Sequence, residues 1–122
     1  MTVKEMKEVL LTNKDLSDHV VKSAWKRLAQ YSNDTPIEQL IEDKVIGSKL
    51  AYNWAKYVGN KNIMKQVILE NEDLGYAYCW AKDIGDRNDM KRIILESRDP
   101  YWAYHWAKNI GNKEEIPKAY VD

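Results

Sequence analysis

Nearly the same nonapeptide occurs three times in this chain, and its copies are evenly spaced. Residues 51–59 read AYNWAKYVG, residues 77–85 read AYCWAKDIG and residues 103–111 read AYHWAKNIG. The copies begin 26 residues apart, without an insertion between them. A tandem repeat with a period in this range is typical of proteins built from stacked supersecondary units. The chain is therefore predicted to repeat one small structural unit along its length.

A second motif lies between the nonapeptides. Residues 62–70 read NIMKQVILE and residues 88–96 read NDMKRIILE, again 26 residues apart. Asp99 followed by Pro100 is a typical helix start, and Asp73 occupies the equivalent place one repeat earlier. Each nonapeptide ends in glycine, which most easily adopts the left-handed backbone that ends a helix. Each repeat is therefore predicted to contain two short helices.

A polar residue follows each of these glycines and is expected to cap the next helix. These residues are Asn60, Asp86 and Asn112. The turn between the two helices is then only about two residues long, which suits antiparallel neighbours. Each repeat is therefore predicted to be a helical hairpin.

The repeat is less regular in the first part of the chain. Thr35 and Pro36 predict the N-cap and first turn of a helix that ends near Lys44. Residues 6–16 match residues 64–74 at seven of eleven positions and predict another helix. Asp15 is then expected to cap a longer helix from Leu16 to about Gln30.

These patterns predict a single all-α domain of eight or nine helices. The expected architecture is an α-solenoid-like stack of short antiparallel helical hairpins with a 26-residue repeat. Residues 1–34 would form a degenerate N-terminal repeat that caps the stack. Residues 35–111 would form the regular repeats, and residues 112–122 a truncated C-terminal repeat that breaks or restarts at Pro117.

Composition narrows the class of protein. The hydrophobic fraction of 44% and the charged fraction of 31% are typical of a soluble globular domain. Lysine plus arginine and aspartate plus glutamate number 19 each, so the chain lacks the basic excess of most nucleic-acid-binding domains. The N-terminus does not resemble a secretory signal, and a cytoplasmic location is expected. Cys79 is the single cysteine, which excludes an internal disulfide.

On a helical wheel, the residues shared by the three nonapeptides form one stripe. The stripe contains both alanines, the tryptophan and the isoleucine or valine of each copy. We expect this stripe to be core rather than a ligand-stacking or base-stacking surface, because aromatic stripes at helical spacing usually pack inside. The expected large core residues are Trp54, Trp80 and Trp106, together with Val58, Ile84 and Ile110.

Tyrosine and lysine occupy the flank of this stripe. Tyr52, Tyr78 and Tyr104 are expected to bury their rings and keep their hydroxyls near water. The lysines of the three copies are Lys56, Lys82 and Lys108. We expect them to complement the helix dipole or to be solvated, and the alternative is a lysine ladder that binds an anion.

The positions that differ between copies are predicted to face away from the core. Varied residues on a constant scaffold are the usual binding surface of solenoids. Leu50, Tyr76 and Trp102 share one wheel position and are expected on the outer ridge of their helices. The candidate partner-binding residues are Asn53, Tyr57, Tyr76, Cys79, Asp83, Trp102, His105 and Asn109.

No catalytic or metal-binding constellation is evident. Cys79 and His105 would lie about 10 Å apart on stacked helices, which is too far for direct proton transfer. His19 has no companion at metal-ligand spacing. The chain is therefore expected not to be an enzyme, and to need neither cofactor nor metal.

The units AYNWAKYVGNKNIMKQVILENEDLGY and AYCWAKDIGDRNDMKRIILESRDPYW resemble short tandem helical repeats of bacteriophage and mobile-element proteins. The resemblance covers residues 37–111. It implies an α-helical repeat protein, encoded by a phage and acting in the host cytoplasm as an accessory or inhibitor of a host factor. It supplies no functional residues.

The predicted function is non-catalytic binding of another macromolecule, with a protein as the favoured partner. The alternative is nucleic-acid binding through Lys56, Lys82, Lys108 and Arg87 with nearby tyrosines, for which affinity would fall steeply with salt. Self-association through the terminal repeats is a further hypothesis. An enzyme remains the remote alternative, and no membrane association is expected.

Overall fold

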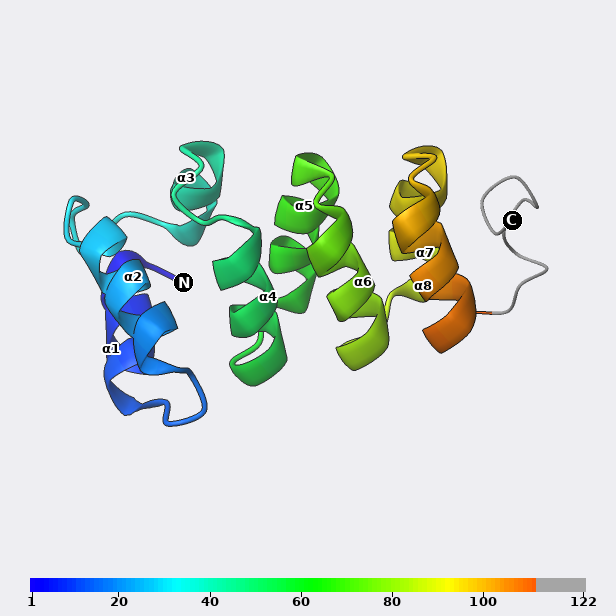
Figure 1. The fold of residues 1–122 in the computed structure, drawn as a ribbon. Helices are drawn as coiled ribbons and strands as arrows, with labels where there is room; N and C mark the ends of the chain where they lie inside the picture. Colours follow the sequence, from blue (N-terminus) through cyan, green and yellow to red (C-terminus); the bar gives the residue numbers. More distant parts are fainter. Residues whose placement is uncertain (112–122) are drawn as a thin grey trace. The chain divides into compact units, whose positions relative to one another are not determined.

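The computed structural model describes residues 1–111 and confirms an all-α fold (Figure 1). Within these residues the only β-type pairing is an isolated antiparallel bridge between Thr2 and Pro36. The predicted truncated repeat at 112–122, with its break at Pro117, lies outside the described residues.

Eight helices follow one another along the described chain. They are α1 (Val3–Thr12), α2 (Asp18–Leu28), α3 (Ile37–Glu42), α4 (Ser48–Tyr57), α5 (Lys61–Asn71), α6 (Leu74–Asp83), α7 (Arg87–Glu96) and α8 (Pro100–Asn109). The helices α4, α6 and α8 each contain ten residues, and their first residues are 26 positions apart. The helix bounds therefore follow the sequence repeat.

The chain divides into two compact units, of which the first comprises residues 1–67 and the second begins at Ile68. The division falls within α5. In the first unit α1 packs against α2 and α2 contacts α4, and in the second unit α6, α7 and α8 pack against one another. A continuous solenoid through both units stays a prediction.

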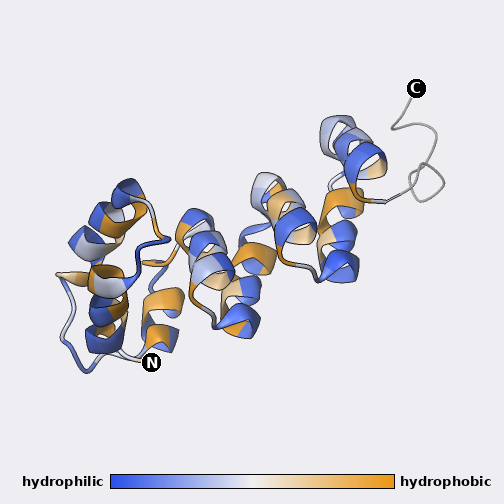
Figure 2. Cartoon of the chain, turned by 90° about the horizontal axis from the view of Figure 1, so that it is seen from below, coloured by the Kyte–Doolittle hydropathy of each residue, from blue (hydrophilic) through white to orange (hydrophobic). Residues whose placement is uncertain are grey.

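The repeated tryptophans are core residues, as predicted. Trp54 and Trp80 are 0% exposed and Trp106 is 1% exposed, and the alanines of each nonapeptide are buried as well. Apolar and polar segments alternate along each helix in Figure 2, as expected for helices with one buried face. The stripe on the wheel therefore corresponds to the buried face.

The aliphatic residues near the end of each nonapeptide are an exception. Val58, Ile84 and Ile110 are half-buried, so their assignment to the core was wrong. Each is the C-cap residue of its helix, one position past the last helical residue. The helical wheel does not hold at this point, because the backbone leaves the helix there.

The predicted starts of α6 and α8 and the predicted ends of α4 and α6 are confirmed. The Asp73 side chain accepts a hydrogen bond from the Tyr76 backbone N–H, and the Asp99 side chain accepts one from that of Tyr101. Gly59 and Gly85 have φ angles of 147° and 138°, in the positive region that favours glycine.

The side chains of the residues after these glycines bind the tryptophan of the preceding helix. Asp86 stands at the N-cap of α7, but its side chain makes no capping hydrogen bond. Its carboxylate instead accepts a hydrogen bond from the buried Trp80 indole N–H at 3.0 Å. The Asn60 amide oxygen accepts the equivalent bond from Trp54 at 3.1 Å. Each of these side chains therefore accepts the hydrogen bond of a buried tryptophan N–H in the preceding helix.

The first helices also differ from the prediction at their N-termini. Thr35 is not a helix cap, because α3 begins at Ile37 and has extended Pro36 as its N-cap. The Thr35 carbonyl instead accepts a hydrogen bond from the Val3 N–H at 2.8 Å. The cap of α2 is Ser17, whose hydroxyl accepts a hydrogen bond from the Val20 N–H.

Asp15 was therefore assigned wrongly as the cap of the second helix. It lies in the turn before α2, where its backbone N–H donates to the Asn13 side chain at 2.9 Å. The helix that follows runs from Asp18 to Leu28 and is shorter than predicted.

Candidate partner-binding surface

The candidate residues fall into two groups. Asn53 and Tyr57 belong to α4 in the first unit, which is described by itself. The other six lie on two neighbouring helices of the second unit. These six are Tyr76, Cys79 and Asp83 on α6, and Trp102, His105 and Asn109 on α8.

Five rings from α6 and α8 form a continuous cluster, which we call the aromatic surface. It consists of Tyr78, Tyr101, Trp102, Tyr104 and His105. The ring centroids of Tyr101 and His105 lie 4.4 Å apart, and those of Tyr78 and Trp102 lie 5.6 Å apart. Tyr101 and Tyr104 are 60% and 45% exposed. The structure thus combines exposed rings with rings that contact the neighbouring helix.

Trp102 packs against the start of α6, beside Gly75. Gly75 lies in the first turn of α6, and a Cβ atom added to it would stand 3.5 Å from Trp102 Cζ2. Further along α8, the Asn109 amide donates a hydrogen bond to the Tyr78 hydroxyl at 2.8 Å. Trp102 and Asn109 therefore connect two helices, in addition to any role toward a partner.

Burial raises the pKa of Tyr76 on α6. The pKa of its phenol is raised above the ordinary value of 10, first by burial and then by the negative charges of Asp73 and Cys79. Tyr76 and Cys79 are half-buried, whereas Asp83 is exposed near the end of the helix. The Tyr76 hydroxyl therefore stays protonated, and able to donate, to higher pH than an ordinary tyrosine.

The candidates of the first unit lie on the outer part of α4. The Asn53 amide donates a hydrogen bond to the Lys49 carbonyl oxygen at 2.8 Å, within its own helix. The Tyr57 ring is exposed, and Lys56 Nζ lies 5.1 Å from its centroid. Leu50, which shares a wheel position with Tyr76, is 6% exposed, so its placement on an outer ridge was wrong. It is buried where α4 faces α2.

Sequence reasoning missed Tyr78, Tyr101 and Tyr104 as parts of a surface cluster. Tyr78 and Tyr104 were expected to bury their rings at the flank of the stripe, but Tyr104 is exposed. The available signal was the local density of rings in residues 101–106, YWAYHW. Such a density within two helical turns places rings on several faces, so some of them must be exposed.

Two lysines of the repeated motif lie over tyrosine rings of their own helix. Lys56 Nζ is 5.8 Å from the Tyr52 ring centroid, and Lys108 Nζ is 5.9 Å from that of Tyr104. Such cation–π contacts stabilise exposed pairs weakly, by about 0.5 to 1 kcal/mol. These contacts within one helix fit a structural role of the lysines better than a ladder that binds an anion.

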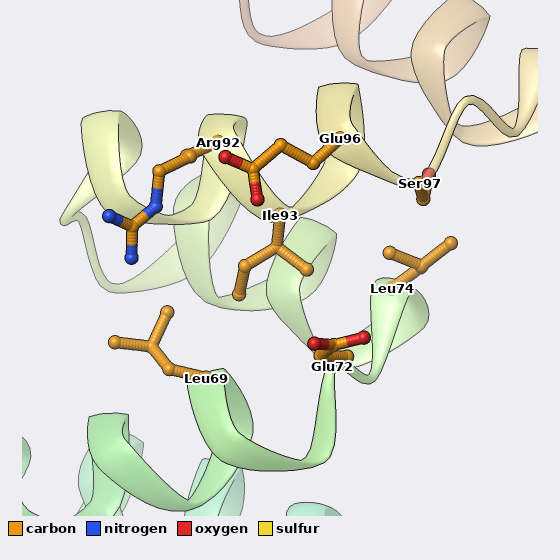
Figure 3. Close-up of a pocket in the computed structure, with 7 residues that line it drawn as sticks. All are labelled: Leu69, Glu72, Leu74, Arg92, Ile93, Glu96 and Ser97. Carbon is orange, nitrogen blue, oxygen red and sulfur yellow. The ribbon is translucent and has the colours of Figure 1, made fainter.

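A groove of about 360 Å³ lies on another part of the second unit (Figure 3). It lies between the end of α5, the start of α6 and α7. Its apolar side is formed by Leu69, Leu74 and Ile93. Glu72, in the turn between α5 and α6, and Glu96 of α7 line it as well. The volume is within the range of small-molecule sites, which is about 300 to 1,000 Å³. Its mixed charges do not indicate one ligand class.

The structure gives two further findings for the described residues. Between residues 1 and 111, His, Cys, Asp and Glu side chains form no group of three that could hold a metal ion. No helix of that part combines the length and apolar composition needed to span a membrane.

No protein family, curated protein or solved structure matches the chain. The resemblance to bacteriophage repeats therefore stays an expectation that rests on the quoted repeat units.

Proposed function

We propose that this protein binds another protein through the aromatic surface on α6 and α8. The observation that carries the proposal is the exposure of Tyr101 and Tyr104, at 60% and 45%, beside the half-buried Trp102 and His105. Tyrosine and tryptophan are enriched among the residues that dominate binding energy at protein interfaces. A contiguous group of such rings on a monomer surface is typical of an interaction site.

The packing of the rings supports the same proposal. Tyr101 lies edge-on to Trp102, with centroids 4.9 Å apart and ring planes at 88°. Tyr78, on the adjacent helix, is held by the hydrogen bond from Asn109. Rings that are already ordered lose less conformational entropy when a partner binds them. The surface is therefore suited to binding a folded partner without large rearrangement.

The test uses capture of a partner by the full-length protein from a lysate of its source organism, followed by mass spectrometry. The Tyr101→Ala/Tyr104→Ala variant is expected to weaken binding of the captured protein by about tenfold or more, because it removes two exposed anchors. Leu11→Ala is the matched control, since Leu11 is an exposed apolar residue on α1. Thermal unfolding should be the same for all three proteins.

Equal capture by the double-tyrosine variant would contradict the proposal. A bound nucleic acid that dissociates steeply with salt and depends on Lys56 and Lys108 would favour the nucleic-acid alternative instead. The role of accessory or inhibitor protein toward a host factor is a finer hypothesis, which the identity of the partner would decide.

A further inference from the structure

A small hollow lies between α2 and α4 in the first unit. Its volume is about 50 Å³, which is several times the roughly 10 to 15 Å³ that a cavity needs to hold one water molecule. Four polar side chains line it: His19, Ser23, Arg27 and Lys49. The hollow has room for one small group rather than for an extended ligand.

The helical geometry explains why these side chains meet. His19, Ser23 and Arg27 are spaced four residues apart, so they follow one face of α2. Lys49 is the second residue of α4 and approaches the hollow from the other helix. The cluster is therefore built by two packed helices rather than by one flexible segment.

The floor of the hollow is apolar. Val20, Ala24 and Leu50 also line the hollow, and these three are buried, whereas His19, Arg27 and Lys49 are exposed. An apolar floor lowers the local dielectric constant and strengthens the interaction between a bound charge and the side chains above it.

All four polar side chains can donate hydrogen bonds, and none of the residues that line the hollow is acidic. Arg27 Nη1 donates to the Val45 carbonyl oxygen at 3.3 Å, which anchors one side of the guanidinium group. Arg27 and Lys49 are both cations, so placing them at one hollow costs electrostatic energy. A bound anion would offset this cost.

The start of α4 adds to the positive potential. Its N-cap is Gly47, which has no side chain to cap the helix, and its first turn contains no acidic residue. Arg27 Nη1 would lie 3.9 Å from a Cβ atom placed on Gly47, so the guanidinium and the helix start are adjacent. The positive end of a helix dipole attracts anions.

We propose that this hollow binds a single free tetrahedral oxyanion such as inorganic phosphate. Arg27 and Lys49 supply the charge, and Ser23 and His19 supply further hydrogen-bond donors. The site lies in the first unit and involves no residue of the aromatic surface. It is therefore a second binding activity, independent of the proposed protein partner.

The test is a titration of the ¹⁵N-labelled full chain with inorganic phosphate, followed by NMR at constant ionic strength with chloride as the balancing anion. We expect saturable shifts that are confined to the amides of α2 and of the start of α4. Arg27→Gln and Lys49→Gln should each weaken binding by about tenfold or more, because each removes a charged hydrogen-bond donor. Arg27→Lys should retain part of the affinity.

Lys26→Gln is the matched control, because Lys26 is an exposed cation on α2 that does not line the hollow. It should bind phosphate like the parent protein. Linear shifts that never saturate, or equal affinity in all the variants, would overturn the proposal. Lys49 is exposed, so Lys49→Gln keeps the test valid even if substitution of Arg27 disturbs folding.

Discussion

At the scale of single residues, the buried tryptophan N–H explains the polar residue that follows each glycine. Trp54 and Trp80 donate to the side chain six positions later, Asn60 and Asp86. Both acceptors have positive φ angles, which asparagine and aspartate tolerate better than most residues. The position therefore requires a side chain that accepts a hydrogen bond and a backbone that adopts the left-handed conformation.

Asn60→Gly is expected to lower the free energy of unfolding by about 1 to 3 kcal/mol, because it leaves the buried Trp54 N–H unsatisfied. Glycine tolerates the positive φ of this position, so the loss reports the hydrogen bond rather than backbone strain. Denaturant unfolding measures the change. Asn60→Asp keeps an acceptor oxygen and is the control, and equal stability of the Gly variant and the parent would contradict the assignment.

The third nonapeptide, residues 103–111, leads to an equivalent prediction. The Trp106 N–H is buried and has no hydrogen-bond partner among the described residues. Asn112 follows Trp106 by six positions in the sequence, at the place equivalent to Asn60 and Asp86. Asn112→Gly should therefore destabilise the protein by a similar amount, and Asn112→Asp should not.

At the scale of single helices, two glycines have opposite roles within one hairpin. Gly75 lies inside α6, where an added Cβ would make ordinary contacts of 3.5 to 3.6 Å with Trp102 and Asp73. Gly85 follows α6 with a φ angle of 138°, and nothing lies within 4 Å of an added Cβ. Space is therefore sufficient at both positions, and the backbone conformation distinguishes them.

The same substitution should consequently change stability in opposite directions. Gly75→Ala is expected to raise the free energy of unfolding by about 0.4 to 1 kcal/mol, because alanine restricts the unfolded chain. Gly85→Ala is expected to lower it by about 1 to 3 kcal/mol, because φ is unfavourable for any residue with a Cβ. Chemical denaturation of both variants tests this, and the same sign for both would refute it.

The helices that the sequence predicts best are those whose ends are encoded locally. Asp73 and Asp99 mark the starts of α6 and α8 correctly, and Gly85 marks the end of α6, because caps and left-handed turns depend on neighbouring residues. The predicted start of α3 at Thr35 was wrong. The Thr35 carbonyl accepts a hydrogen bond from the Val3 N–H, which comes from a distant part of the chain. Such a tertiary contact leaves no local pattern.

At the scale of the whole molecule, the repeat predicts the helix order and the buried tryptophans, but not the composition of the candidate surface. The helical wheel identified Trp102 and His105 as outward residues, whereas their contact with Tyr78 depends on how α8 packs against α6. Trp102 also lies next to Gly75 of α6, a contact that only the packing of the two helices creates. The packing of α8 against α6 determines which rings contact one another. A helical wheel describes one helix at a time and cannot predict these contacts.

The repeated tryptophans Trp54, Trp80 and Trp106 form the core of the described chain and do not contact water. The most direct measurement is ¹⁹F NMR of the full chain labelled with 5-fluorotryptophan, with each resonance assigned by a Trp→Phe variant and compared in H₂O and D₂O. Trp54, Trp80 and Trp106 should show no solvent isotope shift, whereas Trp25, which is 37% exposed, should show a clear one. A shift at Trp80 as large as that at Trp25 would contradict the claim.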